Sequence, residues 1–246
     1  MREDHSRAVR EHFYEGLDYL EKLARFLENH DEPRAAATFD QKNHEAASVI
    51  TFLSPGLRFF HQGQFEGRKK RISPHLVRAP QEPLDSALQK FYTQFLSILK
   101  NPVFRDGQWN LLECVPVWDG NSTWNSFIAF TWEGTDGVRV LVSVNYAPHD
   151  SQCFVHLPFP DMAGHSVRFK DLMSFAVYDR DGSELLSRGL YLDMQSWGYH
   201  VFEVSIPAKL SSAEVDAKTE TNTTKKIKSV SGRKRTESTK NVRRKF

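Results

Sequence analysis

Residues 23–34 read LARFLENHDEPR, a short apolar run followed by Asn-His-Asp and a loop that contains a proline. Residues 53–64, LSPGLRFFHQGQ, repeat this arrangement of an apolar run followed by polar residues. We interpret Leu23–Leu27 and Leu57–Phe60 as brief buried strands that deliver polar side chains at their carboxyl ends. In parallel α/β barrels these strand ends form the active-site face.

Helical patterns flank both predicted strands. Apolar residues recur at three- or four-residue intervals in three segments, which predicts helices over residues 7–23, 41–53 and 84–99. The resulting order is helix, strand, helix, strand, helix. This alternation favours α/β architecture, with the two strands adjacent and parallel because a right-handed crossover would join them.

The amino-acid composition of the chain changes after Asn101-Pro102. From Gly107 to Glu203 the chain is rich in Trp, Val, Phe and Tyr, in short runs separated by turn signals such as Asp179-Arg180-Asp181-Gly182. Such spacing predicts an antiparallel β-sandwich. All five Trp lie in this half; core filling is their expected role, and stacking on sugars is the alternative. Cys114 and Cys153 are predicted to be buried reduced thiols.

Charge divides the chain a second time. Residues 207–246 hold 12 Lys/Arg and 4 Asp/Glu and almost no large apolar residues, which predicts a disordered basic tail. We therefore expect three regions: an α/β region over 1–104, a β-sandwich over 105–206, and the tail. Nucleic acid is not an expected partner, except through the Lys/Arg runs of the tail, for which a plain solvated extension is the preferred interpretation.

Several classes of protein are not indicated. No stretch approaches the roughly 18 apolar residues of a membrane span, and the charged N-terminus shows no signal peptide, so we expect a cytoplasmic protein without membrane contact. A longer parent chain with its own signal remains an alternative. The sequence has no Gly-rich phosphate loop, no CxxC motif and no metal-ligand spacing, which predicts neither a cofactor nor a metal.

The FLENHD motif at residues 26–31 resembles the strand-7 signature of glycoside hydrolase family 13, the α-amylase family. Some thirty residues later, Pro55-Gly56 and the strand ending in Gln62-Gly63-Gln64 resemble strand 8 of that family's barrel. Val142–Tyr146 is similar to a strand of its antiparallel C-terminal domain. The resemblance spans roughly residues 10–205 and implies the last two strands of a (β/α)8 barrel followed by a β-domain.

The resemblance also implies roles for individual residues. Asp31 would be the third catalytic carboxylate, which stabilises the transition state, and His30 would contact the same sugar with Asn29 in support. The other predicted substrate-binding residues are Arg34, Gln62 and Gln64. The implied substrate is an α-glucan or small α-glucoside, processed by a retaining hydrolase or transglycosylase.

The chain departs from the family in what precedes Asn29. The family's nucleophile and general acid stand on strands 4 and 5, and the 28 residues before Asn29 match neither motif. A retaining glycosidase needs both carboxyl groups. The sequence therefore predicts a truncated chain that is inactive alone, in which an open barrel leaves Leu27 and Phe60 facing solvent. The alternative is a non-catalytic carbohydrate-binding or interaction protein built on the β-sandwich.

Overall fold

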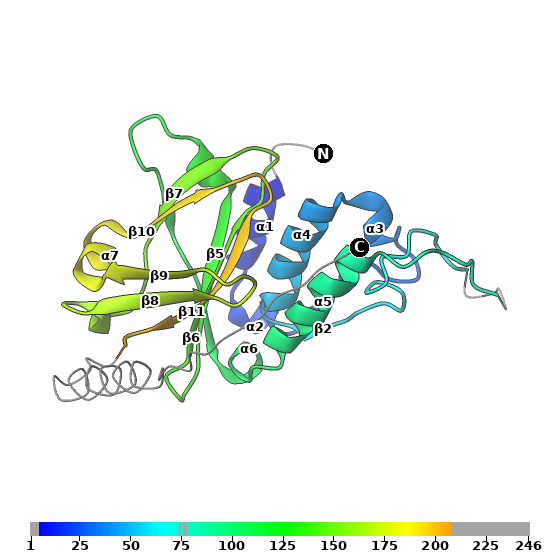
Figure 1. The fold of residues 1–246 in the computed structure, drawn as a ribbon, viewed down its shortest axis with the longest axis horizontal. Helices are drawn as coiled ribbons and strands as arrows, with labels where there is room; N and C mark the ends of the chain where they lie inside the picture. Colours follow the sequence, from blue (N-terminus) through cyan, green and yellow to red (C-terminus); the bar gives the residue numbers. More distant parts are fainter. Residues whose placement is uncertain (1–4, 74, 76–77, 208–246) are drawn as a thin grey trace, which may run out of the picture. The chain divides into compact units, whose positions relative to one another are not determined.

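The computed structural model describes residues 5–73, 75 and 78–207, and the predicted tail lies outside this range apart from Pro207 (Figure 1). The chain begins with α1 (His5–Phe13) and α2 (Leu17–Leu20). The prediction of one helix over residues 7–23 is wrong because Gly16 separates the two at φ 91°, a backbone conformation that favours glycine. None of the described helices is both long and apolar enough to cross a membrane.

Two short strands follow, β1 (Ala24–Arg25) and β2 (Leu57–Arg58), and they pair in parallel. Between them lie α3 (Ala35–Thr38) and α4 (Gln41–Leu53). The Leu57 amide donates to the Leu23 carbonyl at 2.8 Å. The predicted parallel pair is therefore confirmed, although each strand is shorter than the apolar run from which we predict it.

The two faces of this strand pair differ in burial. Leu27 and Phe60 pack against the hydrophobic core, whereas Phe26, Leu57 and Phe59 are 40%, 70% and 43% exposed. The prediction that Leu27 and Phe60 face solvent is therefore wrong by one residue in each strand. Successive side chains of a strand point to opposite faces, so an error of one residue exchanges the two sets.

The third predicted helix is α5 (Ser86–Leu99), and α6 (Val103–Asp106) follows it. The carboxylate of Asp85 caps α5 by accepting from the amides of Ala87 and Leu88, both at 3.1 Å. The helix therefore begins just after this cap rather than at Leu84.

The remainder of the described chain is two antiparallel sheets. One has six strands in the order β3-β5-β6-β11-β8-β9, and the other has three in the order β10-β7-β4. The bounds are β3 (Gln108–Leu111), β4 (Cys114–Val115), β5 (Phe127–Glu133), β6 (Arg139–Asn145), β7 (Ser151–Val155), β8 (Ser166–Asp171), β9 (Val177–Asp181), β10 (Leu190–Met194) and β11 (Tyr199–Ser205), with α7 (Gly182–Arg188) between β9 and β10. The predicted antiparallel region is confirmed. The turn predicted at 179–182 is wrong, because these residues end β9 and begin α7.

The six-stranded sheet carries a hydrophobic core on each face. On β6, Val140, Val142 and Val144 belong to the core shared with the helices, whereas Leu141 belongs to the core shared with the three-stranded sheet. In Figure 1, α4 and α5 lie on one side of this sheet, and β7 and β10 lie on the other. Cys114 and Cys153 lie in the second core as free buried thiols, as predicted.

Candidate active site

The carboxyl ends of β1 and β2 bring together the polar residues that follow each strand. Asn29 shapes the turn after β1, because its Oδ1 accepts from the amides of Asp31 at 2.8 Å and Glu32 at 2.9 Å. This turn leaves the side chains of His30 and Asp31 65% and 71% exposed, with His30 Nε2 3.1 Å from Asp31 Oδ2. His30 and Asp31 are thus neighbours that can reach a ligand.

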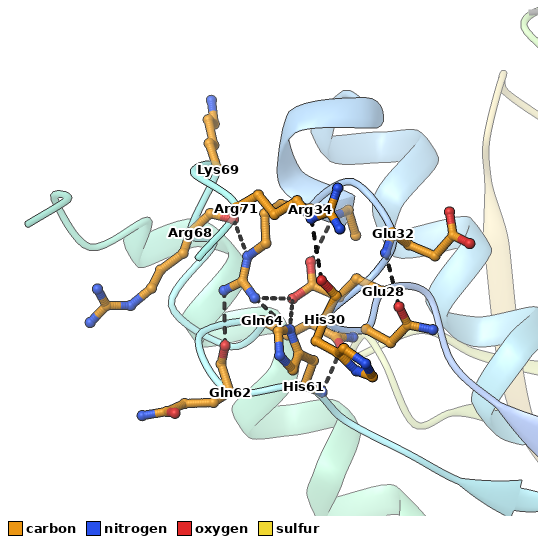
Figure 2. Close-up of polar contacts among 12 residues, drawn as sticks. Glu28, His30, Glu32, Arg34, His61, Gln62, Gln64, Arg68, Lys69 and Arg71 are labelled. Carbon is orange, nitrogen blue, oxygen red and sulfur yellow. Dashed lines mark hydrogen bonds and ion pairs between the residues drawn. The ribbon is translucent and has the colours of Figure 1, made fainter. Parts of the chain in front are cut away.

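A buried ion pair lies beneath this turn (Figure 2). Oε1 of Glu28 lies 3.0 Å from Nη1 of Arg34, and both side chains are 1% exposed. Oε2 of Glu28 accepts from the amide of Ala35 at 2.6 Å, at the start of α3. Burial raises the pKa of the Glu28 carboxyl, while the Ala35 amide and the Arg34 guanidinium oppose that rise.

Arg34 also binds the loop that follows β2. Its Nη2 donates to the carbonyl of Gln62 at 2.9 Å, and its Nε donates to the carbonyl of Arg68 at 3.3 Å. Its Nη1 lies 2.6 Å from Nδ1 of His61, which must accept because a guanidinium only donates. Gly63 has φ 89°, and a Cβ at this position would collide with the Arg34 guanidinium. One buried arginine therefore ties the ends of both strands together.

Gln64 belongs to a second buried polar network. Its Nε2 donates to the hydroxyl of Tyr92 at 2.8 Å, and its Oε1 accepts from the amide of His61 at 3.3 Å. The Tyr92 hydroxyl in turn lies 2.8 Å from Nε2 of His44. Burial raises the pKa of Tyr92 to about 12 and lowers that of His44 to about 4, so both are neutral near pH 7.

The structure thus brings all six predicted site residues to one end of the strand pair, in different settings. His30 and Asp31 are exposed, and Gln62 is exposed while its carbonyl holds Arg34. Arg34 and Gln64 are buried, with internal partners.

The sequence analysis gave no role to Glu28. The signal available was an acidic residue placed directly after an apolar run, with an arginine six positions later. No group of His, Cys, Asp and Glu in the described part of the chain could hold a metal.

No protein-family model matches the sequence, and no curated protein matches it significantly. Solved structures do match. A maltogenic α-amylase, AmyB, from Thermotoga neapolitana superposes with a TM-score of 0.60 at 15% identity, over 82% of this chain and 48% of that chain. The α-amylase of Geobacillus thermoleovorans, solved with acarbose, gives the same TM-score and identity over 82% of this chain and 43% of that chain.

A trehalose-6-phosphate hydrolase from Bacillus licheniformis matches more distantly, with a TM-score of 0.50 at 12% identity. The match covers 81% of this chain and 46% of that chain. This chain therefore has the fold of part of the α-amylases and related glycoside hydrolases, which confirms the predicted resemblance at the level of the fold. It spans less than half the length of the structures it matches.

Proposed function

We propose that this chain forms part of an α-amylase-family enzyme that cleaves or transfers α-glucosidic bonds with retention. It would contribute the last two strands of the barrel and the β-domain that follows. The observation that carries this proposal is the exposed His30–Asp31 pair at the carboxyl end of a parallel strand pair, in a chain with the α-amylase fold. The substrate would be an α-glucan or a small α-glucoside.

In this proposal Asp31 stabilises the transition state. As a glycosidic bond breaks, positive charge develops on the sugar ring, and a fixed carboxylate next to it lowers the barrier. His30 contacts the same sugar, and Asn29 holds the turn that presents both. The burial of Arg34 and Gln64 favours a positioning role for them, since each fastens the loop after β2.

The nucleophile and the general acid would come from barrel strands other than β1 and β2. The open face of this strand pair supports that assignment. Parallel sheets are normally covered on both faces, yet here Phe26, Leu57 and Phe59 are exposed and form an apolar surface. Further strands would bury this surface and place their own carboxylates opposite Asp31.

The test is the release of reducing ends from an α-glucan or a small α-glucoside. We expect none from the 246-residue chain alone, and turnover once the chain is joined to its remaining barrel strands. In that longer enzyme, Asp31→Asn should lower kcat on the order of 10²–10³-fold, because a preorganised transition-state charge is removed.

Glu32→Gln is the matched control, since Glu32 is an exposed carboxylate of the same turn with no proposed contact to the sugar. It should leave kcat nearly unchanged. Full activity of the Asp31→Asn enzyme would contradict the role given to Asp31. Turnover by the 246-residue chain alone would show that this chain already holds a catalytic pair of carboxylates.

A further inference from the structure

A hollow lies in the β-rich half, apart from β1 and β2. Its volume is about 310 Å³, and it forms where β7, β10 and the segment after β4 meet. In Figure 1, β7 and β10 lie across the six-stranded sheet from α4 and α5. The side chains that matter are Trp118, Asn121, Thr123, Asp150, Gln152 and Asp193.

Trp118 differs from the other four tryptophans. Trp109 and Trp132 are buried, and Trp124 and Trp197 are partly buried against the two cores. Trp118 is 55% exposed, and its ring has no aromatic or cationic partner among the described residues. A large indole at an open hollow, contributing little to either core, is available to cover an apolar face of a ligand.

The polar side chains around Trp118 are fixed in place. Nε2 of Gln152 donates to Oδ2 of Asp193 at 2.9 Å, and Oδ1 of Asp150 accepts from the amide of Ser196 at 3.0 Å. Oδ1 of Asn121 accepts from the amide and the hydroxyl of Thr123. These contacts leave oxygens of Asp150, Gln152 and Asp193 with capacity to accept further hydrogen bonds.

The lining selects the class of ligand. Among the residues that the structure describes, no Lys, Arg or His lines the hollow, and its two carboxylates repel phosphates and acidic sugars. A quaternary ammonium ion is bound by a cage of several aromatic rings, and Trp118 is the only aromatic side chain that the described part of the chain contributes to the lining. One ring face beside several acceptors instead matches a neutral ligand that has an apolar face and many O–H donors. That description fits a sugar.

We propose that this hollow is a non-catalytic binding site for a neutral α-glucan chain. Trp118 stacks on a sugar ring, while Asp150, Gln152 and Asp193 accept hydrogen bonds from its hydroxyls. The choice of an α-glucan over other neutral glycans rests on the proposed function. A polymer held here has a raised effective concentration at the His30–Asp31 end of the same molecule.

The test measures binding directly, without turnover. The full chain is titrated with maltoheptaose and followed by tryptophan fluorescence, and it is also run in native gels with and without glycogen. We expect Trp118→Ala to weaken binding about tenfold, the scale of one lost ring contact. Phe175→Ala is the matched control, because Phe175 is a fully exposed aromatic outside the hollow, and it should change nothing. Circular dichroism checks that both variants are folded.

Two results would overturn the proposal: no binding of maltoheptaose or glycogen by the full chain, or binding that Trp118→Ala leaves intact. Equal affinity for cellohexaose would overturn the assignment to α-glucans. The same titration with Asp31→Asn separates the two sites. Binding that depends on Trp118 should persist in that variant, so loss of the catalytic proposal and loss of this one give different results.

Discussion

The loop that presents His30 and Asp31 is held from below by one pair of charges. Glu28 stands before the turn and Arg34 after it, so their 3.0 Å contact closes the loop between them. Arg34 then reaches the carbonyls of Gln62 and Arg68 in the loop after β2. The geometry of the exposed residues therefore depends on two that solvent does not reach.

Removing one charge of this pair should be costly. Glu28→Gln keeps the size of the side chain but leaves the Arg34 guanidinium buried without a counter-ion. We expect the free energy of unfolding to fall by about 3–5 kcal/mol, the scale for breaking a buried pair from one side. Urea denaturation of the purified chain measures this change.

The double variant Glu28→Leu with Arg34→Met is the control for that measurement. Replacing both charges by apolar side chains removes the unpaired guanidinium, so much of the lost stability should return. Asp179→Asn, which breaks an exposed ion pair with Arg168, should have little effect. If Glu28→Gln is as mild as Asp179→Asn, the Glu28–Arg34 pair does not hold the loop.

At the scale of elements, the register of the two short strands decides which side chains are buried and which are exposed. Phe59 and Phe60 are adjacent, yet Phe59 is 43% exposed while the Phe60 ring centroid lies 4.1 Å from that of Phe52 in the core. Phe60→Ser should lower the free energy of unfolding by about 2–4 kcal/mol, and Phe59→Ser by less than about 0.5 kcal/mol.

The same two variants should separate stability from association. Phe59→Ser removes an apolar group from the exposed face of β1 and β2, so it should reduce aggregation, which light scattering measures. Phe60→Ser should increase aggregation, because a lower free energy of unfolding raises the fraction of unfolded chains, which expose apolar side chains. The reverse pattern in both measurements would mean that Phe60 lies on the open face, as the sequence alone predicted.

The elements that the sequence predicted correctly have apolar residues at a regular spacing, which marks their buried side. The elements that it missed have no such pattern. The parallel pair and α4 follow from apolar spacing. All five residues of β9 are exposed, and Asp179 of this edge strand pairs in register with Arg168 of β8. Because no buried apolar residue marks the strand, its sequence resembles that of a polar turn. Gly182 is buried against the backbone of Met162, which no local pattern reveals. The site follows the same rule. The motif predicts a role for Asp31, and that role stays a prediction, whereas the pairing of Glu28 with Arg34 depends on tertiary packing that no motif indicates.

At the scale of the molecule, the helices and the six-stranded sheet share one core. It contains Phe52 and Phe95 from the helices together with Val142 and Val201 from the sheet. The indole of Trp132 on β5 donates to the carbonyl of Leu53 at the end of α4, at 2.7 Å. The residues that the structure describes form one compact unit. The domain boundary near residue 104 stays a prediction made from the sequence. The packing across that boundary affects the stability of both sides.

We expect the two sides of that boundary to unfold together, because separating them would expose Val142 and Val201 to water. Thiol labelling in increasing urea measures this. Cys153 is fully buried between the two sheets, and an Ala46→Cys substitution in a background with Cys114→Ser places a second buried thiol on α4. Both thiols should become reactive with the same urea midpoint. Trp132→Phe, which removes the hydrogen bond to Leu53, should lower both midpoints equally. Reaction of the α4 thiol at clearly lower urea would show instead that residues 105–206 persist as an independent domain after the helices have unfolded.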